Sequence, residues 1–253
     1  MESVPEKTSF SFAGESIPGL VRRGNEDNFI IVAPPARRTL LAAVSDGVGG
    51  HRHGEIVSSI SCREIARRYA GTSDAELCAE GAAERFLEET VTHINRRVFR
   101  MNFLERNPYP MSSTLVILLL TPESAVMANV GDSRLYAVDA RGDVRQLSTD
   151  HTLANDEAYS YLSPRNSVWA THTISRSIGS RYNLRVEVKR FARSGRERYF
   201  LCSDGVYHDL DEPNVRRVLS QAATPRQTLN RIMRAVLLRG AHDNVTAVSI
   251  FPG

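Results

Sequence analysis

The sequence is poor in lysine, and its positive charge is not concentrated anywhere along the chain. Lys7 and Lys189 are the only lysines, and the arginines are scattered between acidic residues, so that the formal net charge is only +3. A protein that binds nucleic acid usually presents a dense basic patch. We therefore expect no nucleic-acid partner, and we interpret the paired arginines as solvated surface charges.

Cysteines and long apolar runs are also scarce. Cys62, Cys78 and Cys202 are too few and too far apart for a disulfide framework or for a paired-cysteine metal site. The longest apolar run, LVILLL at 115–120, is far shorter than the roughly 20 residues of a membrane span. The first residues, MESVPEKTSF, lack the basic and apolar segments of a secretory signal. These absences predict a protein of the reducing cytoplasm with no membrane insertion.

What the sequence does contain is a series of short β-rich runs bounded by Gly, Pro, Asp or Asn. The clearest runs cover 29–33, 39–45, 113–120, 124–130 and 133–138, and others follow later in the chain. Apolar residues at helical spacing predict helices at about 54–70 and 74–101, and two further helices that start near Pro213 and Pro225. Because strands outnumber helices and tight turns join many of them, antiparallel sheets covered by helices are favoured over a parallel sheet.

The length of 253 residues favours one domain that spans 1–253. Within it, the segment 152–172 has weak periodicity and many turn-forming residues, and it contains the only tryptophan, Trp169. We interpret this segment as a variable surface flap.

Acidic residues stand where the apolar runs begin or end. Taken singly, an Asp-Gly pair after a strand is most often a tight turn. Several carboxylates gathered at one edge of a sheet would repel one another unless cations lay among them. The residues in question are Glu26, Asp27, Asp46, Asp132, Asp204 and Asp243.

Ligands that consist only of oxygen select hard cations. No group of cysteines or histidines with zinc-like spacing is present, so Mg²⁺ or Mn²⁺ is favoured over Zn²⁺. Gly47 and Gly205 each follow one of these aspartates. Because glycine has no side chain, its backbone carbonyl could approach an ion directly.

Eight stretches along the chain resemble the motifs of one known family, the metal-dependent protein phosphatases of type 2C in their bacterial form. They occur in the order of that family and cover nearly the whole chain. The stretches are RRGNEDN at 22–28, DGVGGHRHGE at 46–55, SSTLV at 112–116, NVGDSRLY at 129–136, TDHT at 149–152, ISRSIG at 174–179, LCSDGV at 201–206 and HDNVTAV at 242–248.

The resemblance implies an α+β fold, a four-layer αββα sandwich in which two antiparallel β-sheets are flanked by pairs of helices. It also implies a centre of two Mn²⁺ or Mg²⁺ ions at one end of the sandwich. Asp46 resembles the carboxylate that bridges both ions, the Gly47 carbonyl resembles a ligand of one ion, and Asp204 and Asp243 resemble ligands of the other.

Three further residues of the family's site have counterparts in this sequence. Glu26 and Asp27 resemble the acids that hold water molecules bound to the ions. Arg22 resembles the arginine that binds the substrate phosphate, a task for which the guanidinium fork is suited. Together these groups imply attack on phosphorus by a water that the ions activate, without a phosphoenzyme.

Some positions depart from the family's pattern. Val48 stands where eukaryotic members have a histidine implicated as a general acid, and His51, which matches a bacterial Gly-Gly-His pattern, is interpreted mainly as a structural hydrogen-bonding group. Bacterial relatives often bind a third ion through two aspartates. Asp132 matches the first of them, but His208 stands at the second position, so that the sequence leaves a third ion open.

The function expected from the resemblance is the hydrolysis of phosphoserine and phosphothreonine in proteins. The expected partners are phosphorylated proteins, namely a Ser/Thr protein kinase and its substrates, and we expect a monomer. One alternative is a non-catalytic regulatory module with the same fold, although such a module would be expected to lose ligands such as Asp46, Asp204 and Asp243. Another is a phosphatase dedicated to one regulatory phosphoprotein.

Overall fold

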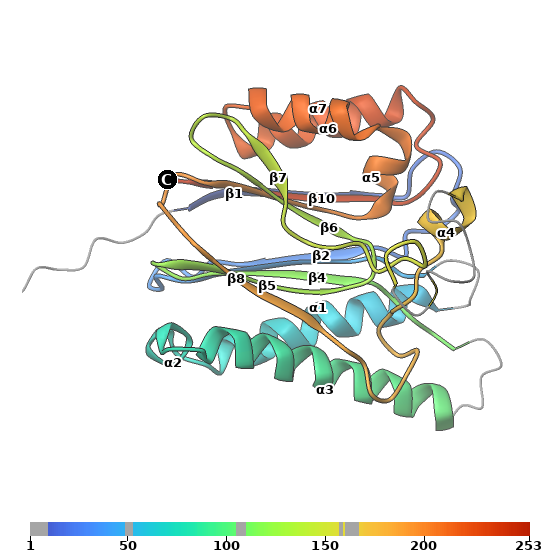
Figure 1. The fold of residues 1–253 in the computed structure, drawn as a ribbon, viewed down its shortest axis with the longest axis horizontal. Helices are drawn as coiled ribbons and strands as arrows, with labels where there is room; N and C mark the ends of the chain where they lie inside the picture. Colours follow the sequence, from blue (N-terminus) through green and yellow to red (C-terminus); the bar gives the residue numbers. More distant parts are fainter. Residues whose placement is uncertain (1–9, 49–52, 105–109, 157–158, 160–166) are drawn as a thin grey trace, which may run out of the picture.

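Two antiparallel β-sheets stacked face to face form the centre of the protein (Figure 1). The structure is a computed structural model and describes residues 10–48, 53–104, 110–156, 159 and 167–253. In hydrogen-bonded order, the first sheet contains β1 (Phe10–Ile17), β10 (Val245–Pro252), β9 (Arg198–Cys202), β6 (Arg134–Val138) and β7 (Val144–Gln146). The second contains β2 (Asn28–Val32), β3 (Leu40–Ser45), β4 (Leu115–Leu120), β5 (Ser124–Val130) and β8 (Glu187–Ala192).

Helices cover the outer face of each sheet. The second sheet packs against α1 (Gly54–Ala70) and α3 (Ala82–Leu104), and the first packs against α6 (Glu212–Gln221) and α7 (Pro225–Leu237) (Figure 1). This arrangement of four layers confirms the predicted α+β sandwich.

Side chains of β4 show how the sequence supplies two of the cores. Successive residues of a strand point to opposite faces of the sheet. Accordingly, Leu115 and Ile117 pack into the core beneath α1 and α3, whereas Val116 and Leu118 pack into the core between the two sheets. A continuous apolar run is therefore required here, because both faces of this strand are buried.

The predicted helix at 74–101 is wrong in one respect, because the segment forms two helices. A short helix, α2 (Asp74–Cys78), ends before α3 begins at Ala82. The chain turns between them at Ala79, which is extended, and at Gly81, which has a φ of 65°. Glycine adopts this left-handed conformation without the steric cost that other residues have, and it thereby ends one helical stretch and starts the next.

Two helix starts agree with the sequence. The Ser73 hydroxyl accepts a hydrogen bond from the backbone N–H of Glu76 at the start of α2, and the Thr224 hydroxyl accepts one from Gln227 at the start of α7. Both are side-chain caps of free helix N–H groups. Two more short helices, α4 (Val168–His172) and α5 (Asp204–Asp209), were not predicted from periodicity because they are too short to show it.

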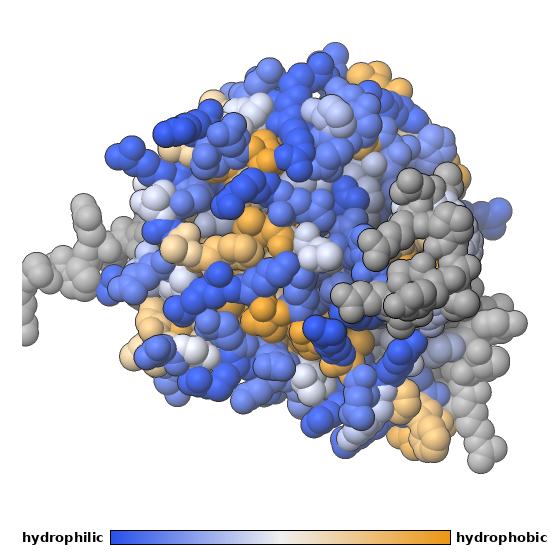
Figure 2. Space-filling model, in the orientation of Figure 1, coloured by the Kyte–Doolittle hydropathy of each residue, from blue (hydrophilic) through white to orange (hydrophobic). Residues whose placement is uncertain are grey.

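The flap expected at 152–172 lies partly outside the described residues. In its described part, the Ser167 side chain caps α4 by accepting a hydrogen bond from the N–H of Ala170. Figure 1 shows α4 at the same end of the sandwich as α5. Figure 2 shows hydrophilic side chains over most of the viewed face, with apolar side chains in small separate groups. Within the described part of the chain, no helix is both long and apolar enough to cross a membrane.

Candidate functional site

A pocket of about 390 Å³ lies at one end of the sandwich, and most of the acidic residues singled out in the sequence line it. Asp46 directly follows β3 of the second sheet, Asp204 follows β9 of the first sheet, and Asp243 precedes β10. Strand ends from both sheets therefore bring these carboxyl groups to one place. The sequence-predicted residues that line the pocket are Arg22, Glu26, Asp46, Gly47, Asp204 and Asp243.

The carboxyl groups at the centre of the pocket contact one another. The Asp46 carboxyl lies close enough to Asp27 and Asp204 for their charges to act on it. Burial raises the pKa of Asp46 well above its ordinary value, and the charges of Asp27 and Asp204 raise it further. Burial likewise raises the pKa of Asp204 to about 7 and raises the pKa of Asp27. The negative charge of this cluster is thus unfavourable unless cations compensate it.

Some oxygen atoms of the cluster are buried and have no hydrogen-bond partner in the structure. They include Oε2 of Glu26, Oδ1 of Asp27 and Oδ1 of Asp132. Buried polar atoms are normally satisfied, and carboxylate oxygens with free lone pairs are the ligands that Mg²⁺ and Mn²⁺ prefer. The donor set therefore fits hard divalent cations.

The described residues do not, however, present a complete ligand arrangement. No three His, Cys, Asp or Glu side chains among them have a geometry that could hold a metal ion. At one edge of the pocket, Nη2 of Arg22 donates to Oδ2 of Asp243 at 2.7 Å. This hydrogen bond raises the pKa of Arg22, and its geometry means that the guanidinium neutralises one of the carboxylates expected to bind a cation.

Two hydroxyl side chains whose role was not predicted hold the acidic residues in place. Oγ of Ser203 donates to Oδ2 of Asp27 at 2.7 Å. The N–H of Asp46 donates to Oγ1 of Thr114 at 3.1 Å, and the N–H of Thr114 donates to the Asp46 carbonyl at 2.8 Å. Both hydroxyl residues belong to stretches that resemble family motifs, but sequence spacing alone does not indicate which carboxylate each one contacts.

Asn244 orients the loop that carries Arg22 and Glu26. Its Nδ2 donates to the carbonyl of Gly24 at 2.8 Å and to that of Pro18 at 3.0 Å. Its Oδ1 accepts from the N–H of Glu26 at 2.9 Å. One side chain at the start of β10 thus satisfies three backbone groups of this loop.

Gly47 and Gly205 are required by close backbone packing. A Cβ atom on Gly47 would lie 2.7 Å from the backbone of Gly54 and 2.8 Å from Cβ of Glu26. A Cβ atom on Gly205 would lie 2.0 Å from the carbonyl oxygen of Asn244. Any larger residue at either position would displace these segments. This is a steric reason for glycine at position 47, and the role of the Gly47 carbonyl as a metal ligand stays a prediction.

Asp132 lies beside the pocket rather than in its lining. Its side chain is buried, and burial together with the charge of Asp204 raises its pKa to about 7. Its backbone carbonyl accepts a hydrogen bond from the Tyr207 hydroxyl at 2.9 Å. Whether Asp132 binds a third ion stays a prediction, and His51 lies outside the described residues.

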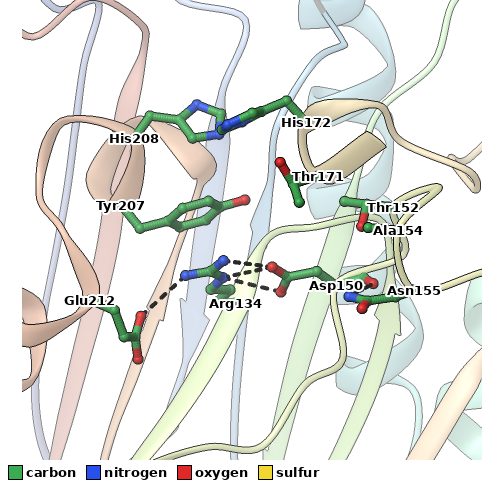
Figure 3. A pocket seen from close by; sticks show the side chains of 10 residues that line it. All are labelled: Arg134, Asp150, Thr152, Ala154, Asn155, Thr171, His172, Tyr207, His208 and Glu212. Atoms are coloured by element: carbon green, nitrogen blue, oxygen red, sulfur yellow. Dashed lines mark hydrogen bonds and ion pairs between the residues drawn. The ribbon is translucent and has the colours of Figure 1, made fainter. Parts of the chain in front are cut away.

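A second, larger pocket of about 730 Å³ was not predicted from the sequence (Figure 3). On one side, the Arg134 guanidinium lies 3.5 Å from the centre of the Tyr207 ring and donates to Asp150 at 2.6 Å and to Glu212 at 3.2 Å. The rings of His172 and His208 lie next to each other on another side (Figure 3). Its contacts join residues distant in sequence, and no local pattern reveals them.

Comparison with known proteins relates the chain to phosphatases. The family described as protein phosphatase 2C matches residues 23–238. The serine/threonine phosphatase stp of Listeria innocua is 27% identical over 243 residues, which cover 92% of either protein.

Solved structures give the same relationship. PppA of Pseudomonas aeruginosa, described as a key regulatory component of T6SS, has a TM-score of 0.79 at 28% identity and covers 97% of this chain and 99% of its own. The serine/threonine phosphatase Stp1 of Staphylococcus aureus has a TM-score of 0.86 at 24% identity, with coverage of 97% and 96% respectively. At that identity the second likeness concerns the fold alone.

Proposed function

The chain belongs to the protein phosphatase 2C family, a family of metal-dependent phosphatases, and we propose that it hydrolyses phosphoserine and phosphothreonine in proteins. The observation that carries this proposal is the gathering of Asp46, Asp204 and Asp243 around one pocket with Arg22 at its edge. The serine/threonine phosphatase of Listeria innocua, similar over nearly its whole length, supports the substrate class.

The proposed cofactors are two Mn²⁺ or Mg²⁺ ions, which supply Lewis acidity and activate a water for attack on phosphorus. Asp46 would contact both ions, the Gly47 carbonyl one of them, and Asp204 and Asp243 the other. Glu26 and Asp27 would orient water molecules around them. The raised pKa of Asp46 supports this assignment, because a buried carboxylate becomes stable as an anion only beside a compensating charge.

Arg22 is proposed to bind the phosphate of the substrate. In the structure its guanidinium is paired with Asp243 at 2.7 Å and is still 46% exposed. A cation bound by Asp243 would compensate that carboxylate and release the guanidinium. The released fork would then face a substrate phosphate with two parallel donors, a geometry suited to its oxygens.

The test is phosphate release from a phosphothreonine peptide in the presence of Mn²⁺. We expect activity in the untreated protein and none after chelation, after Asp46→Ala or after Asp243→Asn. Glu88→Gln, an exposed change on α3, serves as the control with normal activity. Equal turnover by the chelated enzyme would contradict the mechanism, and no turnover by the unmodified protein would favour the non-catalytic regulatory module.

The physiological partners are proposed to be a Ser/Thr protein kinase and its substrates. The alternative is one dedicated regulatory phosphoprotein. A phosphoproteome comparison of cells with and without the gene separates them, because the first predicts many sites with increased phosphorylation and the second predicts sites in one protein. A single domain over 1–253, a monomer and a cytoplasmic location stay predictions, which limited proteolysis, light scattering and cell fractionation test.

A further inference from the structure

Two histidines connect Asp204 to the short helix α4. His208 stands one helical turn after Asp204 on α5, and its Nδ1 lies 3.3 Å from Oδ2 of that carboxylate. Its other ring nitrogen, Nε2, lies 3.0 Å from Nδ1 of His172 at the end of α4. Figure 3 shows the two imidazole rings next to each other on the side of the pocket opposite Asp150. A continuous series of contacts therefore joins the first pocket to α4.

The chemistry of the groups indicates where the protons lie along these two contacts. An ionised carboxylate only accepts, so the His208 nitrogen beside Asp204 carries the proton. In a neutral imidazole the other nitrogen is then an acceptor, and Nε2 of His208 accepts from Nδ1–H of His172.

Both histidines are exposed, but His208 has a second aromatic neighbour. The His208 ring meets the ring of Tyr207 edge-on at a centroid distance of 5.0 Å, and Tyr207 in turn stacks on Arg134. His172 is exposed and belongs to a helix that runs only from Val168 to His172. The hydrogen bond to His208 thus connects α4 to α5, the short helix that begins with Asp204.

The position of α4 also bears on the first pocket. Ile174, which lines the pocket that contains Asp46 and Asp204, follows His172 by two residues. A shift of α4 would therefore move a residue of that pocket. His172 itself lines the neighbouring pocket, so this segment touches both.

We propose that His208 and His172 are positioning residues that orient the carboxylate of Asp204 for cation binding and couple that binding to the placement of α4. This inference rests on the proposed function, since it takes Asp204 as a metal ligand. A ligating carboxylate uses one oxygen for the ion, and a polar partner beside the other, here Nδ1 of His208 at 3.3 Å, fixes its orientation and strengthens binding. Because coupling between two sites is reciprocal, a cation at Asp204 would in turn stabilise the seated position of α4.

Trp169 provides a direct readout of this coupling. It is the only tryptophan of the chain, it lies on α4 one turn before His172, and it is 63% exposed. Mg²⁺ is the suitable probe, because it is not paramagnetic and does not itself quench fluorescence. We expect Trp169 emission of the full chain to change with Mg²⁺ concentration, with the same midpoint as the binding isotherm from calorimetry.

Variants of the two histidines separate the proposed role from a merely structural one. His208→Phe and His172→Phe keep a ring but remove the hydrogen bonds, and each is expected to weaken Mg²⁺ binding by about 10-fold and to abolish the Trp169 response. His208→Gln keeps one donor and one acceptor and is expected to restore both. His93→Gln is the control, since His93 also lies beside a carboxylate, that of Glu64 on α1, and should behave like the unmodified protein.

The outcomes are distinct. If the unmodified protein binds Mg²⁺ but Trp169 does not respond, or if both phenylalanine variants bind and respond like the unmodified protein, the coupling is refuted while the proposed phosphatase function stands. If the unmodified protein binds no divalent ion, the proposed function fails as well. Since the His172 side chain is exposed, His172→Phe tests the proposal even if His208→Phe does not fold.

Discussion

The two pockets at this end of the sandwich differ in the surroundings of their ionisable side chains. In the first pocket, the carboxyl groups of Asp46 and Asp204 are gathered side by side, and burial raises the pKa of Asp204 to about 7. In the second pocket, the Asp150 carboxylate pairs with Arg134 at 2.6 Å. Burial alone would lower the pKa of Arg134, but its hydrogen bonds to Asp150 raise it overall.

The difference supports the proposal that the first pocket is the functional site. Charges that neutralise each other within the chain contribute to stability and need no ligand. Charges that repel each other cost stability, and a fold retains them where a ligand completes the site. By this criterion we propose that the first pocket binds cations, whereas the Arg134–Asp150 pair of the second pocket needs none.

The largest expected effect comes from Asp46→Asn, which removes a charge from the first pocket. We expect phosphatase activity to fall at least about 10³-fold, the loss typical when a group that stabilises transition-state charge is removed. In the metal-free protein the same change should increase the free energy of unfolding, because it removes repulsion from Asp27 and Asp204. Peptide dephosphorylation and urea unfolding in the presence of chelator measure the two effects. A metal-free variant less stable than the unmodified protein would contradict the comparison.

The matching change in the second pocket, Asp150→Asn, should act in the opposite direction on stability. Arg134 and Asp150 are both largely shielded from solvent, with side-chain exposures of 17% and 14%. Removal of one partner leaves a buried charge without full compensation, and we expect a loss of about 3 kcal/mol in the free energy of unfolding. Urea unfolding checks this value, with the exposed Asp143→Asn as control. If both asparagine variants shift stability in the same direction, the distinction between the pockets fails.

A third prediction concerns pH and His151, which lies near the second pocket. Burial lowers the pKa of His151 to about 4, and its Nδ1 accepts from the N–H of Gly131 at 3.1 Å. The unfolded chain takes up this proton near pH 6.5, but the folded protein does not until about pH 4.

The stability contributed by neutral His151 is therefore present above pH 6.5 and is lost as the pH falls toward 4. The variant His151→Asn keeps a hydrogen-bond acceptor. We expect it to lose roughly 2 kcal/mol less free energy of unfolding than the unmodified protein over this pH range. Thermal unfolding at a series of pH values measures it. If stability falls equally with decreasing pH in the variant and in the unmodified protein, the lowered pKa of His151 is contradicted.

The smallest expected effect is that of Arg22→Ala on substrate binding. Loss of a charge-assisted hydrogen bond to phosphate should raise KM for a phosphopeptide by about 10-fold and change kcat less. Arg217→Ala on α6, away from the pocket, is the control. If steady-state kinetics show the same KM for Arg22→Ala and for the unmodified protein, Arg22 does not bind the substrate phosphate.

The fold and the gathering of acids could be predicted because both depend on patterns that repeat along the chain. Runs such as 115–120 show a strand buried on both faces, and aspartates at strand ends meet wherever those ends meet. The break between α2 and α3 was missed, since one glycine in an amphipathic stretch does not by itself exclude a continuous helix.

The contacts that orient the site could not be predicted, because they depend on side-chain direction and on distant segments. The hydrogen bond of Ser203 to Asp27 and that between His172 and His208 join residues that no local pattern relates. For Gly47 the sequence suggested a chemical reason for glycine, and the structure adds a steric one.

The three hydrogen bonds from the Asn244 side chain have a consequence for how this site tolerates change. The loop with Arg22 and Glu26 leads into β2 of the second sheet. The hydrogen bonds fix this loop to the residue before β10, a strand of the first sheet. The proposed binding of phosphate by Arg22 and the proposed orientation of water by Glu26 thus both depend on Asn244. Replacement of Asn244 would displace Arg22 and Glu26 together. The positions of these two side chains therefore cannot change independently of each other when neighbouring residues are substituted.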